Sequence, residues 1–500
     1  AGNLAILYED QGLYKKAEFY ARKTLEIDFT LIQREAPYLA LSERNLFSES
    51  FGYTYERVFS YAFQGETGKN IALFSRLNKQ GLLEEIERRQ AKLSVLPGPQ
   101  KKVANQLKKI TQEVSSRDIS DEERKNLLEE KQNLERKLYR LLPELKPRIV
   151  TVSQIAKLIP KKSLLIEFIK YSPYSGSNID EEKWGKERYL ALTLNNNGDI
   201  DAIDLGEAEL IENKIQKALI ASEQFLSDAQ ELWNEVGNLV IKPLDKFIEN
   251  NETIFISPDA ELNRIPFAAI NSHKGSNLLG EVVDLRLLTT GRDLLKLANK
   301  SNNSNKESLV VANPNFDKRI NTSNKNYSIA LKASKTQQRS GDFTFQSWNP
   351  LPGTSREGQI IAKITNAELL MEDKASSLAV QQKISPKILH IASHAYFMPD
   401  KKGLENPLLR SGIVLAGANQ PDLNPNDDGY LLALEVAKLE WQGTEMAVIS
   451  GCESGKGDIQ SGEGVYGLKR AIAVAGARSS LLSLWKVNDN ATAAFMESFY

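Results

Sequence analysis

The apolar residues of this chain change their spacing after Pro147, and that change limits which folds are open to it. Up to this point they recur at the three- and four-residue steps of amphipathic helices, whereas beyond it apolar runs of strand length alternate with helical stretches. The runs are SLLIEFIKY, RYLALTL, TIFISPD, SLVVANP, KILHIASH, SGIVLAG, EMAVISGC and SSLLSLW. Such alternation predicts an α/β fold with a largely parallel sheet and helices on both faces, preceded by an all-α region.

Residues 1–95 have helical periodicity and open with AGNLAILYEDQGLYKKAEFYARKTLEID. Six residues of this stretch fall at the spacing of a tetratricopeptide (TPR) repeat: Leu4, Tyr8, Gly12, Tyr14, Ala17 and Leu25. The region therefore resembles the end of a TPR array, and we expect further repeats before Ala1, because such a unit buries its face only by stacking. Phe29 stands where the repeat usually has proline, so an unrelated helical hairpin is the alternative.

Residues 96–147 are dense in Lys, Glu, Arg and Gln. Four leucines follow each other at steps of seven, four and three residues: Leu127, Leu134, Leu138 and Leu141. This spacing predicts a charged helical hairpin or short coiled coil, and LPGPQ at 96–100 is expected to turn the chain between its arms. The charges are most simply a solvated helix face.

Two tracts rich in Asn, Ser and Lys, at 296–306 and 317–349, are typical of surface loops and divide the α/β part of the chain. We place its front half at 148–307 and its back half at 308–500. Because the chain stops at Tyr500 within an amphipathic pattern, we expect the back half to be truncated.

The composition limits the partners and the compartment. Lys and Arg number 64 against 65 Asp and Glu, so no global field draws the chain to nucleic acid or to an anionic membrane. The sequence has no apolar run long enough to span a membrane and no signal-peptide layout at its start. One cysteine in 500 residues is typical of a reducing compartment. We therefore expect a cytoplasmic protein without a membrane partner or a direct nucleic-acid partner.

The residues best suited to chemistry follow two apolar runs of the back half. Cys452, the only cysteine, ends EMAVISGC, and His394, one of three histidines, ends KILHIASH. Because parallel strands present their carboxyl ends at one edge of a sheet, neighbouring strands would bring the thiol and the imidazole together. An imidazole lowers the pKa of an adjacent thiol and can protonate a leaving amine, so the pair indicates cysteine-hydrolase chemistry. An inert buried cysteine is the alternative.

Other motifs in this region indicate neither a metal nor a cofactor. His390 and His394 would lie about 13 Å apart on a strand, too far to share a metal ion, so His390 is predicted to be a hydrogen-bonded core residue. GCESGKG lacks the spacing and the Ser or Thr of a phosphate-binding loop. SGEGVYG at 461–467 matches G-x-G-x-x-G and is predicted to open a helix over 462–477, but it follows a loop and not a strand, which argues against dinucleotide binding.

An ordered set of motifs resembles the CHAT domain, a caspase-like cysteine peptidase module related to separases and usually found beside TPR repeats. The motifs are ILHIASHAYF, ENPLLRSGIVLAG, DGYLLALEVAKLE, VISGCESGKGD and SGEGVYGLKRAIAVAGARSSLLSLWKVND. Upstream, YLALTLNNNGDIDAIDLG, ISPDAELNRIPFAAI and TTGRDLL are similar to that family's front half. The resemblance implies a caspase-like fold, with a pseudo-protease-like front half at 148–307 and a catalytic half at 308–500.

Residue by residue, the resemblance implies His394 as the general base and Cys452 as the nucleophile. The backbone amides of Ala395 and Cys452 would form the oxyanion hole. Caspases have glycine directly after the histidine, so Ala395 fits only if its φ is negative. The sequence names no third residue that orients His394, and a backbone carbonyl is the alternative to a side chain.

Substrate preference is inferred from acidic residues near the proposed dyad. Separases prefer arginine, so the resemblance implies a pocket for a basic side chain, and we name Glu463 and Asp489 as its candidate residues. The alternative is that these acidic residues are solvated and that Asp489 caps the helix that begins near Ala491.

These features leave three functions to compare. The weakest, nucleotide-dependent signalling, depends only on the glycine motif at 461–467 and would be discounted by a failure to bind ATP or NAD. The first is a cysteine endopeptidase that cleaves a protein substrate and is regulated by a protein partner bound to its TPR region. The alternative is a TPR-CHAT interaction scaffold whose protease fold is idle or regulatory. A scaffold has no need of a cysteine and a histidine at two strand ends, so this placement favours the enzyme.

Overall fold

The structure is a computed structural model of the chain. It describes all residues except 116–119, 175–182, 273–276, 299–306, 320–346, 399–405, 425–426 and 461–462. The loops expected at 296–306 and 317–349 therefore lie mostly outside the described residues. The chain forms two compact units: unit 1 comprises residues 1–110, 128–302 and 457–466, and unit 2 comprises 111–127, 303–456 and 467–500. The division at 95, 147 and 307 stays a prediction.

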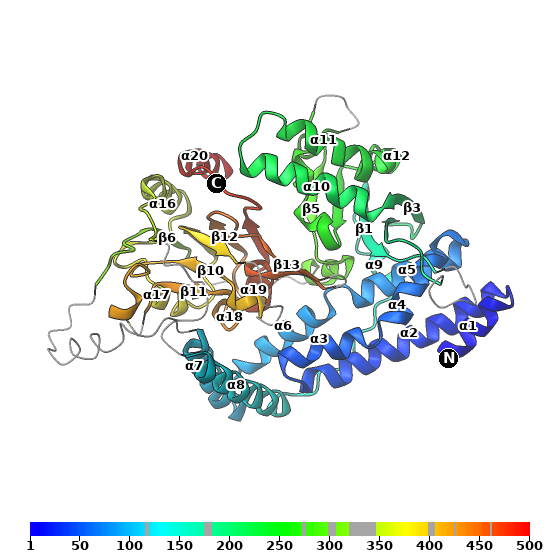
Figure 1. Ribbon diagram of the computed structural model, residues 1–500, viewed down its shortest axis with the longest axis horizontal. Coiled ribbons are helices and arrows are strands. Elements are labelled where there is room, and N and C mark those ends of the chain that lie inside the picture. Colours follow the sequence, from blue (N-terminus) through cyan, green and yellow to red (C-terminus); the bar gives the residue numbers. More distant parts are fainter. Residues whose placement is uncertain are drawn as a thin grey trace. The chain divides into compact units, whose positions relative to one another are not determined.

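The chain begins with a helical region, coloured blue to cyan in Figure 1. Its helices are α1 (Gly2–Asp10), α2 (Tyr14–Glu35), α3 (Leu41–Glu49), α4 (Gly52–Phe59), α5 (Glu66–Lys79), α6 (Leu82–Ser94), α7 (Pro99–Ser115), α8 (Asp121–Leu141) and α9 (Val152–Ala156). α1 and α2 pack against each other, and α2 continues through the fully buried Phe29, where proline would interrupt it. The end of α7 lies beside the start of α8, where Arg124 donates a hydrogen bond to Val114 O.

The sheet of unit 1 is mixed. Its strands are β1 (Ser163–Tyr171), β2 (Arg188–Asn195), β3 (Ile200–Glu207), β4 (Thr253–Ser257) and β5 (Asp284–Leu287), in the order β3-β2-β1-β4-β5. β1, β4 and β5 run parallel, but β1, β2 and β3 are antiparallel neighbours, which differs from the predicted parallel arrangement. For β2 and β3 the reason is the tight turn around Gly198 (φ 94°), which joins them without a crossover helix. The helices that follow are α10 (Ala208–Glu223), α11 (Ala229–Val240), α12 (Asp245–Ile248), α13 (Leu279–Val282) and α14 (Leu294–Leu297).

A buried ion pair joins the helical region to this sheet within unit 1. Arg76 of α5 lies 3.0 Å from Glu167 of β1 and 3.4 Å from Asp259, and all three side chains are almost fully buried. Removing one partner of such a buried pair typically costs about 3–5 kcal/mol, because it leaves the other charge uncompensated. This pair connects α5 to the mixed sheet, and both belong to unit 1.

Unit 2 has the predicted parallel sheet. Its strands are β6 (Leu309–Pro314), β7 (Glu368–Glu372), β8 (Ile388–Ala392), β12 (Met446–Ser450) and β15 (Ser479–Leu482), in the order β15-β12-β8-β6-β7, with every neighbouring pair parallel. The helices are α16 (Pro352–Thr365), α17 (Ser377–Gln381), α18 (Ala433–Val436), α19 (Leu468–Ala475) and α20 (Asp489–Phe499). Figure 1 shows α16 and α20 on one side of the sheet and α18 and α19 on the other.

Unit 2 also contains a smaller antiparallel sheet. Its strands are β9 (Ala395–Phe397), β10 (Ser411–Val414) and β11 (Tyr430–Leu432). The apolar run SGIVLAG thus forms β10 of this sheet and no strand of the parallel sheet. β9 begins directly after His394 and is therefore part of the site described below.

Residues 461 and 462 of the glycine-rich segment lie outside the described residues, and 463–467 do not open a helix as predicted. A hairpin of β13 (Gly457–Gln460) and β14 (Gly464–Gly467) precedes α19, which begins only at Leu468. Glycine serves the hairpin because a Cβ on Gly457 would lie 2.4 Å from Tyr466 O. Residues 457–466 belong to unit 1, although the flanking strands β12 and β15 belong to unit 2.

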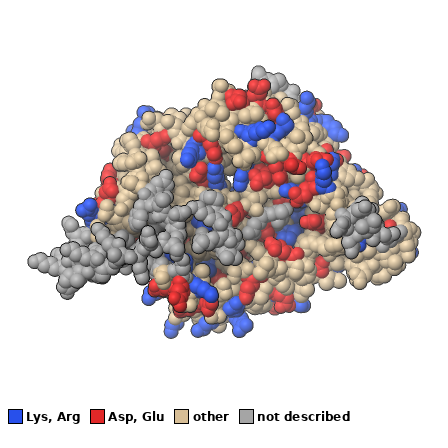
Figure 2. Space-filling model, in the orientation of Figure 1, with Lys and Arg blue, Asp and Glu red and all other residues tan. Residues whose placement is uncertain are grey.

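The charged side chains of both signs are interspersed over the face drawn in Figure 2. Among the helices of the described residues, none is both long and apolar enough to cross a membrane.

Candidate active site

Adjacent parallel strands place the two predicted dyad residues at the same edge of the unit 2 sheet. β8 and β12 are direct neighbours, and Ser450 lies opposite Ala392 at their carboxyl ends. His394 and Cys452 each follow two residues beyond that paired position. Neighbouring strands are about 4.8 Å apart, so the two backbone segments leave the sheet side by side. The predicted arrangement at the ends of adjacent parallel strands is confirmed.

Gly451 holds the two segments together beyond the strands. A Cβ on Gly451 would lie 2.3 Å from Ser393 O and 3.2 Å from Ala395 N, so only glycine allows this approach. Ser393 N also donates a hydrogen bond of 3.3 Å to Ser450 O. Backbone contacts thus fix the positions from which the imidazole and the thiol start.

A sharp turn follows Cys452. Glu453 adopts a left-handed conformation with φ 57°, which is uncommon for a residue with a side chain. Its N–H donates to Trp485 O at 3.2 Å. The Cys452 thiol is partly exposed, accepts a hydrogen bond from Val487 N at 3.5 Å and lies 3.7 Å from Val487 O, to which it donates. The nucleophile candidate therefore sits at a bend, bounded by the segment after β15.

The imidazole of His394 lies between two aromatic rings and is oriented by a backbone carbonyl. Its ring centre is 5.3 Å from that of Phe316 and 5.1 Å from that of Trp348. Nε2 donates to Asn349 O at 2.8 Å, which leaves Nδ1 as the proton acceptor of the neutral ring. The residue that orients His394, which could not be named from the sequence, is therefore Asn349, through its backbone carbonyl.

Burial lowers the pKa of His394 below its usual 6.5, while the hydrogen bond to Asn349 and the negative charge of Asp489 act in the opposite direction. Burial has the larger effect because the charged imidazolium loses more hydration than the neutral ring. A neutral imidazole at pH 7 can accept a proton from a thiol, which is the task of a general base.

Ala395 fulfils the condition set for the oxyanion hole. It is a strand residue opposite Ile413, and its φ is negative, as the prediction requires. Val414 N donates to His394 O, so Ala395 and Ile413 form the non-hydrogen-bonded pair and the Ala395 N–H points away from β10. The 3.2 Å from Ala395 N to the Cβ position of Gly451 places this amide on the side of Cys452. The oxyanion-hole role of both amides stays a prediction.

The two pocket candidates have partners inside the fold. Glu463 belongs to unit 1, is 6% exposed, lies 3.1 Å from Lys79 Nζ and accepts a hydrogen bond from Leu83 N. Asp489 belongs to unit 2 and accepts a hydrogen bond of 2.7 Å from Gly353 N. Their role in substrate binding stays a prediction.

The residue that caps α20 is Asn488, whose side chain accepts from Ala491 N at 3.1 Å. The alternative assignment of Asp489 as this cap is therefore wrong, because the helix begins at Asp489 itself. Asn488 is the N-cap type that the sequence offers one position earlier.

His390 is confirmed as a core residue. It is fully buried, with Nε2 2.9 Å from Glu357 Oε1 and Nδ1 3.2 Å from Tyr500 OH. Both ring nitrogens are therefore engaged within the core of unit 2, and His390 is separate from the dyad.

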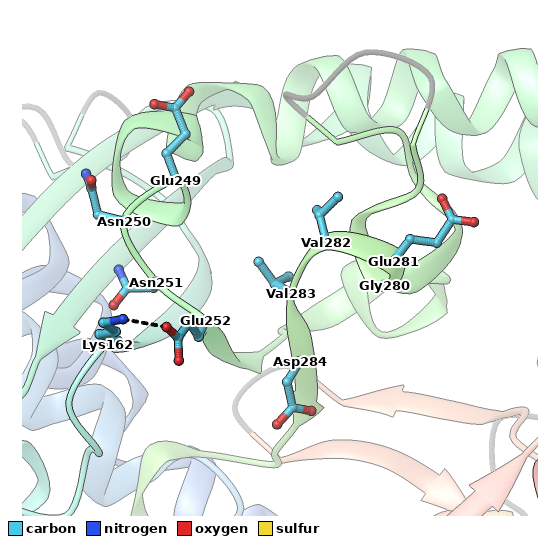
Figure 3. A pocket seen from close by; sticks show the side chains of 10 residues that line it. All are labelled: Lys162, Glu249, Asn250, Asn251, Glu252, Gly280, Glu281, Val282, Val283 and Asp284. Carbon is cyan, nitrogen blue, oxygen red and sulfur yellow. Dashed lines mark hydrogen bonds and ion pairs between the residues drawn. The ribbon is translucent and has the colours of Figure 1, made fainter.

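A shallow hollow of about 590 Å³ lies in unit 1, at the amino ends of β4 and β5. Figure 3 shows its acidic side chains from Glu249, Glu281 and Asp284, and the 2.6 Å ion pair of Lys162 with Glu252. Ligands of α/β sheets bind at the opposite, carboxyl ends of the strands. The hollow therefore is no part of the candidate active site.

Comparison with protein families matches residues 230–500 to the CHAT domain. A comparison with curated proteins found no match. The matched region contains both His394 and Cys452 and the whole parallel sheet of unit 2. With more than half of its length matched, and with a parallel sheet that carries a cysteine and a histidine at neighbouring strand ends, the chain belongs to the CHAT-domain family, which is related to the caspase-like cysteine peptidases.

Proposed function

We propose that the chain is a cysteine endopeptidase of the caspase/separase-like class, with Cys452 as nucleophile and His394 as general base. The observation that supports this proposal is the register of β8 and β12, which sets both residues two positions beyond the Ala392–Ser450 pair. The carbonyl that orients His394 adds to it, because it leaves Nδ1 free to take a proton.

In the proposed reaction, Nδ1 of His394 takes the thiol proton as Cys452 Sγ attacks the carbonyl carbon of the scissile peptide bond. The N–H groups of Ala395 and Cys452 stabilise the negative charge that develops on the carbonyl oxygen. The imidazolium returns its proton to the leaving amine as the C–N bond breaks, which leaves a thioester. Water, deprotonated by Nδ1, hydrolyses the thioester and restores the thiol.

The test uses the full chain with peptide libraries and with a peptide-derived ketone electrophile. Wild-type protein should cleave peptides and become labelled once, at Cys452. Cys452→Ala should abolish both, and His394→Asn should lower kcat/KM by about 10²–10⁴-fold. Both variants should keep the wild-type far-UV circular dichroism and melting temperature. Cleavage that survives Cys452→Ala would contradict the proposal.

We further propose that a protein partner regulates this activity through the helical region, which we interpret as TPR-like. Large apolar side chains are exposed on α1 and α2: Leu4, Leu7, Tyr14, Phe19 and Ile27. Such side chains can pack against a preceding TPR-type repeat or against a partner protein. Low basal turnover that rises when a cognate partner is added is the expected result, and full turnover without any partner would contradict it.

One observation favours the alternative of a scaffold with an idle dyad. The thiol of Cys452 donates to Val487 O and not to the imidazole. If the chain is such a scaffold, the electrophile fails to label Cys452 under any condition while partner binding persists. We also propose a cytoplasmic location, because a single free cysteine in 500 residues fits a reducing compartment.

A further inference from the structure

The carbonyl of Asn349 needs support from its surroundings, because the residue itself is exposed. On its amino side, Trp348 is anchored by its N–H to Asn419 Oδ1 and by its indole N–H to Tyr430 OH, both at 2.8 Å. On its carboxyl side, Pro350 and Pro352 stiffen the link to α16, since proline fixes φ. The position of the carbonyl thus depends on where α16 begins.

The first turn of α16 is attached to Asp489. Asp489 Oδ2 accepts a hydrogen bond of 2.7 Å from Gly353 N, one of the amides that a helix leaves unpaired at its start. A Cβ on Gly353 would lie 2.6–2.8 Å from the three carboxylate atoms Oδ2, Cγ and Oδ1 of Asp489. Gly353 is therefore the residue type that allows the carboxylate to reach the helix.

The segment that carries Asp489 also contacts the thiol. Val487, two residues earlier, donates its N–H to Cys452 Sγ at 3.5 Å. Three links thus connect the dyad through unit 2: Cys452 with Val487, Asp489 with Gly353, and Asn349 with His394. The link between Asp489 and Gly353 lies in the middle of this path.

We propose that Asp489 is a positioning residue of the dyad, which acts through Gly353 to hold the Asn349 carbonyl against His394. This inference rests on the proposed peptidase function, and it differs from a role of Asp489 in the substrate pocket. Two uncharged rings, those of Phe316 and Trp348, also lie against the imidazole. The carboxylate of Asp489 raises the pKa of His394 against the effect of burial.

The experiment compares four variants of the full chain. Asp489→Ala removes the acceptor and the charge, Asp489→Asn removes only the charge, and Gly353→Ala blocks the approach. Glu497→Gln is the matched control, because Glu497 pairs with Arg356 at 3.1 Å on the exposed side of the same two helices. For each variant we would measure kcat, KM and melting temperature, and the pKa of His394 by NMR of labelled histidine in a Cys452→Ala background.

Asp489→Ala and Gly353→Ala should lower kcat by about 10- to 100-fold with little change in KM, because small displacements of catalytic groups have effects of this size. Asp489→Asn should lose less kcat, and the pKa of His394 should fall in both Asp489 variants. Glu497→Gln should change neither kcat nor the pKa of His394. The resonances of His390 should serve as an internal reference.

Three results would overturn the inference: unchanged kcat in folded Asp489→Ala, a rise in KM alone, which indicates a substrate pocket, or an equal loss in Glu497→Gln. If wild-type protein shows no turnover or labelling, the proposed function fails. The pKa and the Nε2–H tautomer of His394 still decide the positioning role, since they are measured without substrate.

Discussion

Replacement of Gly451 by alanine tests the close approach on which the dyad depends. The new Cβ would lie 2.3 Å from Ser393 O, whereas ordinary contact begins at 3.4 Å. The segments that carry His394 and Cys452 must therefore separate by about 1 Å, since neither neighbour is a flexible side-chain end. Overpacking of this kind costs about 1–3 kcal/mol of unfolding free energy.

The effect on chemistry should exceed the effect on stability. A displacement of about 1 Å can lower kcat/KM by about 10²-fold. This corresponds to about 2.7 kcal/mol of transition-state stabilisation. We would measure the second-order rate of Cys452 labelling by the peptide-derived electrophile, together with urea unfolding.

Gly237→Ala is the matched control, because its Cβ would also meet a neighbour at 2.3 Å, Ile270 Cγ2, but in unit 1. It should lower stability and leave the labelling rate of the folded protein unchanged. A Gly451→Ala variant with the wild-type labelling rate and unfolding free energy would refute the reasoning.

Three further predictions concern titratable side chains. His390→Ala should lower the unfolding free energy by about 3 kcal/mol in urea, since it leaves buried Glu357 unpaired, and unchanged stability would contradict a core role. The lowered pKa of His394 means that the unfolded chain binds more protons near pH 6.5. Stability should therefore rise with pH through this window, and the rise should be smaller in His394→Asn. Glu463→Gln should destabilise unit 1 because it weakens the ion pair with Lys79; a loss of cleavage after Arg or Lys with unchanged stability would instead assign Glu463 to the substrate pocket.

The sequence was sufficient to predict the parallel sheet and the neighbouring strand ends, because both follow from apolar runs and from the side chains that end them. Cys452 and His394 are rare residue types at positions where strands end, so the sequence alone is enough to identify them as candidates. The same holds for His390, whose apolar neighbours indicate burial.

Features that depend on the backbone were not predictable in this way. The orienting group of His394 is a carbonyl, which every residue has, so no side chain marks Asn349. The glycines at 464 and 467 predict the start of a helix, but the structure has them in the strand β14. Glu463 lies after β12 in the sequence but belongs to unit 1, and no residue near it marks this change of unit; its pocket role stays a prediction.

The hairpin at 457–466 has a consequence for any attempt to dissect the protein. It interrupts the sequence of unit 2 between β12 and β15, yet its carboxylate at Glu463 pairs with Lys79 of α5. A chain shortened from the amino end would keep every strand of the parallel sheet but would strip the hairpin of its counter-charge. Loss of activity in such a fragment would therefore combine a folding defect with the loss of the proposed regulatory region. The modularity of this chain has to be probed by point substitutions, since no single cut separates its two units.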